Sequence, residues 1–189
     1  MDILSYAIQF WEVTLVAFVV ILEIFARAFD RHKKTKHKFK FETMPAMRPI
    51  RIPTSGRGAL SALWVWMLKL RKWELVEDFY YTIDDVDYVV PAGFYFDAAS
   101  IPKFLHRLLS PTGILLVGSL IHDYGYVYKK LCLVSGEHTD EISRKHADKL
   151  FRDINIQVNG FNTLNRILYY MLRLFGIFAW NKLRKFNNQ

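Results

Sequence analysis

Four side chains in the second half of the sequence are of the types that move protons or bind divalent cations. They comprise one imidazole and three carboxylates, on His122, Asp97, Asp123 and Asp148. Such a set suits a hard or borderline divalent cation that could activate a water molecule. Alternatively, His122 could be a general base that a carboxylate orients. Neighbouring residues of a helix point about 100° apart, so His122 and Asp123 cannot both bind one metal ion with good geometry. The site would then need two metal ions, or His122 and Asp123 would have different roles.

The same residues also allow interpretations without catalysis. Asp97 could cap a helix that Pro102 opens, and Arg144 and Asp148 have i, i+4 spacing on one helix. His122 could donate to Asp148 inside a half-buried polar network, which would fix the fold without catalysing a reaction. A structural network, a hydrolytic or metal site and a ligand pocket are therefore all compatible with the sequence.

Three segments carry these residues with a regular spacing. They begin at residues 91, 122 and 144 and read PAGFYFDAASIP, HDYGY and RKHADKLF. The combined pattern, PAGFxxDxASxP then HDxxY then RxxxDxxF, resembles an uncharacterised domain found mainly in phage and bacterial proteins. The resemblance covers about residues 73–180 and implies a shared fold and a clustered polar site, without an established activity. The expected cluster consists of Asp97, Ser100, His122, Asp123, Tyr126, Arg144 and Asp148.

The segment HDYGY also resembles the His-Asp-x-Cys-Tyr motif of secreted phospholipases. The matching positions are His122, Asp123 and Tyr126. Gly125 stands where the motif has cysteine, and no glycine-rich calcium loop precedes the segment. The resemblance is therefore limited to three side chains, which would make the site hydrolytic.

Strands and helices must hold these residues in place. Residues 73–83 and 87–96 are rich in aromatic and β-branched side chains and are separated by an Asp-Asp pair, which predicts two strands and a turn. Residues 59–72 have helical length and an apolar face. The expected fold is mainly α with a small β element, an α+β fold, within a domain that spans residues 59–189.

Four further helices are predicted after residue 100. A short one begins at Pro102, a second at Ser110, and a third is capped by Thr139. The fourth spans about residues 161–184 and is apolar, but Arg166 and Arg173 interrupt it. We interpret this last segment as a core or membrane-surface helix.

The N-terminal segment, residues 3–29, is almost continuously apolar. About 20 apolar residues suffice to cross a bilayer as a helix, so we expect a transmembrane helix within residues 1–30. Only Asp2 precedes this segment, whereas a run of basic residues begins near its end and continues after it: Arg27, Arg31, Lys33, Lys34, Lys36, Lys38 and Lys40. Positive charge stays on the cytoplasmic side, which predicts a single-pass protein of a bacterial inner membrane with its C-terminal domain in the cytoplasm.

Polar residues lie on one side of this predicted helix. The seam comprises Ser5, Gln9, Glu12, Val16, Val19, Glu23 and Arg27. Ionisable groups at membrane depth are costly unless they face protein or water, so we expect the helix to form a homo-oligomer with the seam inward, either closed or lining a pore. A helix lying flat in the membrane interface is the alternative.

Residues 31–58 form a basic linker that prolines divide into extended pieces. Its charge favours contact with anionic membrane lipids, and RNA is the alternative partner. A short anchor, a basic neck and a small helical domain also resemble the membrane-bound accessory protein of RNA-targeting (type VI-B) CRISPR systems. That resemblance implies an antiviral defence role beside an RNA-guided effector. Arg31 and His37 have the spacing of a ribonuclease-like motif, although they lie in the neck.

Composition limits the remaining possibilities. The formal charge of +8 favours anionic partners, and the single cysteine, Cys132, excludes an intramolecular disulfide and a zinc site built on cysteines. The leading hypothesis is an accessory protein that oligomerises in the membrane and forms a pore. The alternative is a membrane-tethered, metal-dependent hydrolase that uses His122 and Asp123 as catalytic residues.

Overall fold

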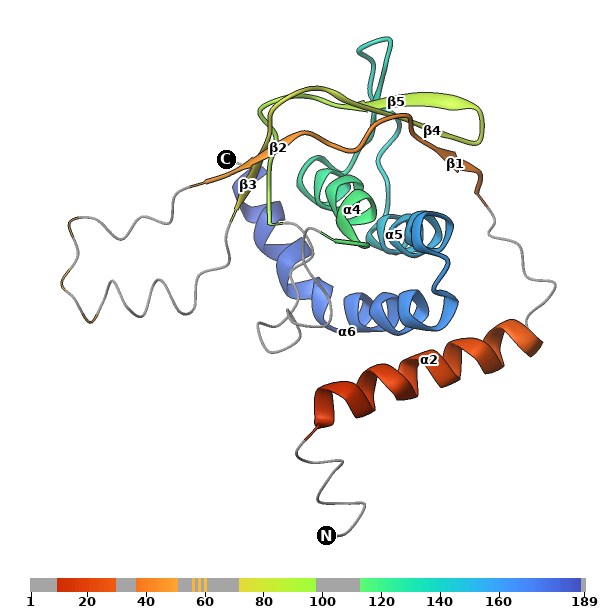
Figure 1. Ribbon diagram of the computed structural model, residues 1–189. Coiled ribbons are helices and arrows are strands. Elements are labelled where there is room, and N and C mark those ends of the chain that lie inside the picture. Colours follow the sequence, from red (N-terminus) through yellow and green to blue (C-terminus); the bar gives the residue numbers. More distant parts are fainter. Residues whose placement is uncertain are drawn as a thin grey trace, which may run out of the picture.

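Antiparallel strands on one side and helices on the other make up the described part of the chain. The computed structural model describes residues 10–29, 37–50, 56, 58, 60, 72–97 and 113–187. Figure 1 shows the strands lying over two helices, α4 (Leu116–Tyr128) and α5 (Arg144–Asn159). Helix α6 (Asn162–Asn187) lies on the other side of these two, and α2 (Trp11–Phe29) runs along the outside of α6. The result is a layered α+β arrangement.

The strands form two sheets in which every neighbouring pair is antiparallel. One sheet has the order β1-β4-β5-β7 and the other has the order β2-β3-β6. The strands are β1 (Phe39–Lys40), β2 (Met47–Pro49), β3 (Trp73–Leu75), β4 (Phe79–Ile83), β5 (Val86–Val90), β6 (Tyr95–Phe96) and β7 (Cys132–Leu133). The β structure is therefore larger than the small element that the sequence predicted.

The predicted Asp-Asp turn is confirmed. Asp84 and Asp85 join β4 to β5 with φ angles of 51° and 64°, as a two-residue hairpin turn requires at both positions. The flanking segments each form two strands rather than one, because the chain passes from one sheet to the other within each. Gly93, with a φ of 79°, makes the second of these crossings, and its N–H donates to the carbonyl oxygen of Leu75 at 2.7 Å.

Helix α4 occupies the centre of the molecule. Ten of its residues are buried, and they pack against the inner sides of the sheets and against α5. Leu120 and Ile121 are among the most buried side chains, and each contributes about 1.5–3 kcal/mol to the free energy of unfolding. A Cβ atom on Gly118 would lie 2.3 Å from the side chain of Asn155, so glycine is needed where α4 and α5 meet.

The helix ends agree only partly with the prediction. Helix α6 is found close to the expected range, but α5 begins later than expected because Ser143, not Thr139, is its N-terminal cap. The Ser143 hydroxyl accepts from the N–H of His146 at 3.2 Å. Thr139 instead accepts from the N–H of Leu131 at 3.0 Å, within a turn. The helices predicted over residues 59–72 and after Pro102 lie outside the described residues.

The predicted transmembrane helix is wrong. Helix α2 forms where a helix was expected, but no helix in the described part of the chain combines the length and the apolar character needed to cross a membrane. Three ionisable residues, Glu12, Glu23 and Arg27, interrupt its 19 residues. The fold class with a spanning helix and the single-pass inner-membrane localisation are corrected accordingly.

Glu23, which the sequence assigned to an oligomer seam in the membrane, is instead buried against α6. Its side chain is only 4% exposed, and its carboxylate accepts from the N–H groups of Asn162 at 2.9 Å and Thr163 at 2.7 Å. These are the first residues of α6, where unpaired N–H groups and the helix dipole favour a negative charge. Glu23 therefore caps α6 and joins it to α2.

The other seam residues do not share this contact. Val16 is exposed and Val19 is half-buried. Ser5, Gln9 and the side chains of Glu12 and Arg27 lie outside the described part of the structure.

Replacement of Glu23 by glutamine should weaken the attachment of α2 to α6. The amide would turn an NH₂ group towards one of the two backbone N–H donors, so we expect a loss of about 1–2 kcal/mol in the free energy of unfolding. Urea denaturation measures it, with Glu77→Gln at an exposed position as the matched control. Equal stability of the two variants would contradict the capping role.

Candidate functional site

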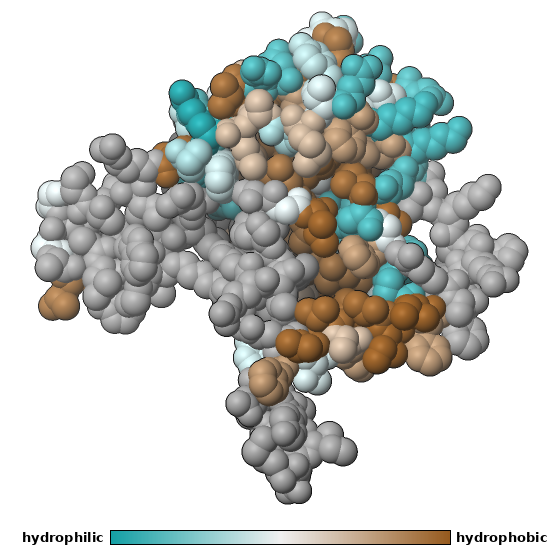
Figure 2. Space-filling view, in the orientation of Figure 1, coloured by the Kyte–Doolittle hydropathy of each residue, from teal (hydrophilic) through white to brown (hydrophobic). Residues whose placement is uncertain are grey.

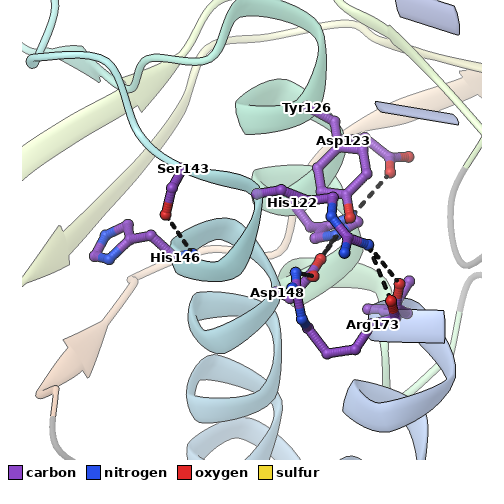
Figure 3. A network of polar contacts seen from close by, with 9 residues as sticks. His122, Asp123, Tyr126, Ser143, His146, Asp148 and Arg173 are labelled. Atoms are coloured by element: carbon purple, nitrogen blue, oxygen red, sulfur yellow. Dashed lines mark hydrogen bonds and ion pairs between the residues drawn. The ribbon is translucent and has the colours of Figure 1, made fainter. Parts of the chain in front are cut away.

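His122 and Asp148 form a buried pair between α4 and α5. His122 is 7% exposed, Asp148 is 0% exposed, and His122 Nε2 lies 3.1 Å from Asp148 Oδ1. Figure 3 shows both side chains in the space between the two helices and α6. The core packing of α4 and α5 holds the backbones of both residues, so the imidazole has a fixed position and a fixed carboxylate partner.

Asp148 receives two further hydrogen bonds. The Tyr126 hydroxyl donates to Oδ1 at 2.5 Å, and Arg173 Nη1 on α6 donates to Oδ2 at 2.8 Å. Burial opposes the charge of Asp148, but the hydrogen bonds from His122, Tyr126 and Arg173 outweigh it and lower the pKa of Asp148. For Tyr126, burial and the hydrogen bond to Asp148 raise the pKa of the phenol above its usual range. Asp148 is therefore a charged, fully paired carboxylate.

The second ring nitrogen of His122 faces Asp123. Nδ1 lies 3.4 Å from Asp123 Oδ1, a long contact, and within the described residues no hydrogen bond of ordinary geometry reaches the buried Asp123 Oδ2. Burial alone would lower the pKa of His122, yet the hydrogen bonds to Asp123 and Asp148 raise it overall. Burial is also the main cause that raises the pKa of Asp123; the charge of nearby Asp97 adds to it, and hydrogen bonds from His122 and from the Asp97 backbone oppose it. The imidazole is therefore held closely by Asp148 and only loosely on the Asp123 side.

Aromatic rings enclose the pair. The Tyr126 ring lies 4.0 Å from the His122 ring, centroid to centroid, and the Phe151 ring meets His122 edge-on at 5.5 Å. Trp180 of α6 packs edge-on against Tyr126 at 5.0 Å. These apolar walls exclude water from part of the site and strengthen the electrostatic interactions inside it.

Arg144 positions α6 beside the site. Its Nη1 donates to the carbonyl oxygens of Leu172 at 3.3 Å and Arg173 at 3.1 Å. Figure 1 shows α6 bending between two arms, and an arginine inserted at helix carbonyls close to Gly176 accounts for such a bend. A Cβ atom on Gly176 would lie 2.7 Å from the Tyr126 hydroxyl, so glycine is needed for α6 to approach the site.

The predicted cluster is only partly assembled. The structure brings together His122, Asp123, Tyr126 and Asp148, with Arg144 beside them. Asp97 lies after β6 and influences Asp123, whereas Ser100 lies outside the described residues. The predicted ion pair between Arg144 and Asp148 is replaced by the pair between Arg173 and Asp148.

The expected metal ligands do not form one group. Within the described ranges, no set of three or more His, Cys, Asp or Glu side chains is arranged to hold a metal ion. The reason lies in Asp148, whose oxygens already accept from His122, Tyr126 and Arg173. Asp148 therefore already has its hydrogen-bond partners on the Nε2 side of His122. Asp123, with Asp97 near it, lies on the Nδ1 side.

Sequence reasoning missed the part that α6 plays. The sequence pattern indicates Arg173 only as an interruption of an apolar helix, and it does not place Trp180 at the site. An arginine in an otherwise apolar helix is itself a signal, because burial of its charge requires a carboxylate partner. The sequence gives no indication of which carboxylate is that partner.

The comparisons with known proteins identify the region that carries this site. Residues 73–172 match a family model described as "Protein of unknown function (DUF1353)", which covers more than half of the chain. The chain belongs to the DUF1353 family. The DUF1353 region contains the sheet strands from β3 onward, α4, α5 and the first part of α6. It therefore includes His122, Asp123, Tyr126 and Asp148, whereas Arg173 and Trp180 follow its end.

The remaining comparisons add no relative. A search of curated proteins and a search of solved structures found no match. The match to DUF1353 confirms the expected uncharacterised domain, but the comparisons support neither its motif pattern nor the resemblance to the CRISPR accessory protein. Of the ribonuclease-like pair, Arg31 lies outside the described residues, and His37 contacts Asp84 at 2.6 Å.

The pKa shifts predict how stability changes with pH. Because the pKa of His122 is raised on folding, its contribution is complete below the ordinary value of about 6.5 and is lost as the pH rises through the folded value. For Asp148, whose pKa is lowered, the contribution is present above about 3.9 and is lost as the pH falls through the folded value.

Wild type should therefore lose more unfolding free energy than a His122→Asn variant between about pH 6 and pH 9. Urea denaturation at both pH values measures the difference. Parallel losses in the two proteins would show that the folded pKa of His122 is not raised.

Proposed function

We propose that this DUF1353 protein is a hydrolase in which His122 acts as the general base that activates a water molecule. The observation that supports it is the two-sided setting of the imidazole. Nε2 is held by Asp148 at 3.1 Å, while Nδ1 makes only a long contact of 3.4 Å with Asp123 Oδ1. A carboxylate-held imidazole whose second nitrogen is bound only loosely suits proton abstraction from water.

The tautomer follows from the contacts. In the neutral ring, Nε2–H donates to the charged Asp148, so the lone pair lies on Nδ1, where a water molecule could donate to it. Asp123 Oδ2 would accept the other hydrogen of that water. Asp148 stabilises the imidazolium that forms, and the charge of Arg173 together with the Tyr126 hydroxyl keeps Asp148 deprotonated and in place.

Carboxylic esters are the substrate class that suits these surroundings. The water oxygen bonds to the acyl carbon as Nδ1 takes its proton, and the imidazolium then returns the proton to the leaving oxygen as the C–O bond breaks. The products are an acid and an alcohol. Asp97 and Asp123 would repel a phosphate group, whereas Phe151 and the other aromatic walls suit an uncharged acyl chain. The limited resemblance of the HDYGY segment to secreted phospholipases agrees with this assignment.

A His122→Asn variant should lose ester hydrolysis and keep its fold. Asparagine can donate to Asp148 but cannot take a proton, so we expect kcat for p-nitrophenyl butyrate to fall about 100-fold or more. The matched control is His138→Asn, at an exposed histidine. Release of p-nitrophenol measures the rate, and thermal melting measures the fold.

Three results bear on the interpretation. Wild-type protein that releases p-nitrophenol no faster than buffer would contradict the proposal, as would a His122→Asn variant with the wild-type rate. In either case the buried network has a structural role only. Loss of the rate in EDTA and its return with Ca²⁺ or Mn²⁺ would favour the metal-dependent version, with the cation bound on the Asp123 side.

A further inference from the structure

We infer that the outer face of α2 is a docking surface for an anionic lipid bilayer, which it contacts from one side without crossing. The inference is independent of the proposed hydrolase. The outer face is defined here by five large apolar side chains that project away from the rest of the chain: Val13, Phe18, Ile21, Ile24 and Phe25. Each is at least half exposed, between 50% and 66%.

These residues form one continuous side of the helix. At about 100° per residue, they span an arc of about 140°, and the buried Glu23 and half-buried Val19 point to the opposite side. Figure 2 shows the corresponding brown band on the surface of α2. An apolar patch of this kind on a helix is unusual for a surface that faces only water.

The buried carboxylate of Glu23 is turned away from this face. Both oxygens of Glu23 accept from the first N–H groups of α6, so its charge is neutralised on the inner side. Among the outward side chains that the structure describes, none is charged. The capping contact thus fixes the rotation of α2 about its own axis and presents its apolar side outward.

The charge of residues 30–40, which follow α2, favours an anionic bilayer over a second copy of the chain as the partner of this face. Within residues 30–40, Asp30 is followed by six cations, Arg31, Lys33, Lys34, Lys36, Lys38 and Lys40. A second copy of the chain would bring a like-charged segment and a net charge of +8 against this one, which opposes association. Anionic headgroups attract such a segment, by about 1 kcal/mol for each basic residue near the surface. Apolar side chains beside a basic segment are the features of helices that lie in the membrane interface.

Flotation of the full chain with vesicles tests this inference. We expect the protein to float with vesicles of phosphatidylglycerol and phosphatidylcholine, to remain in the buffer with phosphatidylcholine alone, and to be released by about 0.5 M NaCl. A Phe18→Ser/Phe25→Ser variant should bind the anionic vesicles at least tenfold more weakly. The matched control is Val86→Ser/Val134→Ser, at two exposed valines of the sheet side, which should bind as wild type does.

Several outcomes would overturn the inference. They are wild-type protein that stays in the buffer with anionic vesicles, and a double variant that binds as wild type does. A dimer in light scattering that the double variant converts to a monomer, without vesicle binding, would make the face a self-interface instead. If the double variant fails to fold, Ile24→Ser replaces it with the same expected direction. His122→Asn should float like wild type, which separates this result from the hydrolase.

Discussion

The buried carboxylate of Asp148 is the interaction on which the rest of the structure depends. It sits on α5 with no exposed surface and accepts from His122 and Tyr126 of α4 and from Arg173 of α6. A buried charge of this kind is destabilising unless every partner is in place. Three helices must therefore pack together for Asp148 to be satisfied. Gly118, between α4 and α5, and Gly176, beside Tyr126, are positions where a larger residue would force Asn155 or Tyr126 to move.

The same arrangement makes the two sides of the His122 ring different: Nε2 is held closely by Asp148, and Nδ1 makes a long contact with Asp123. Both oxygens of Asp148 accept hydrogen bonds, so His122 is held through its Nε2. Asp123, the residue after His122 on α4, makes looser contacts, with His122 at 3.4 Å and with the backbone of Asp97. The Asp123 carboxylate is thus held less tightly than that of Asp148, and burial raises its pKa. That asymmetry is the main argument for chemistry at this position.

Local patterns in the sequence predicted the parts of the structure that depend on nearby residues. The Asp-Asp hairpin turn, the last helix and the meeting of His122 with Asp148 all follow from spacing and residue type. The role of Arg173 could not be predicted, because it depends on a bend in α6 that Arg144 stabilises from another helix. The capping of α6 by Glu23 could not be predicted from the sequence either, because Glu23 and Asn162 are 139 residues apart in the chain. A carboxylate in an apolar helix indicated burial against protein, but periodicity alone assigned it to a membrane seam.

The most direct measurement of how Asp148 holds His122 is an NMR titration of the His122 ring in the intact chain, with the resonances assigned through His122→Asn. We predict a neutral ring that carries its proton on Nε2, hydrogen-bonded to Asp148, and a pKa above the ordinary value of about 6.5. A ring that carries its proton on Nδ1, or one that titrates below that value, would contradict it.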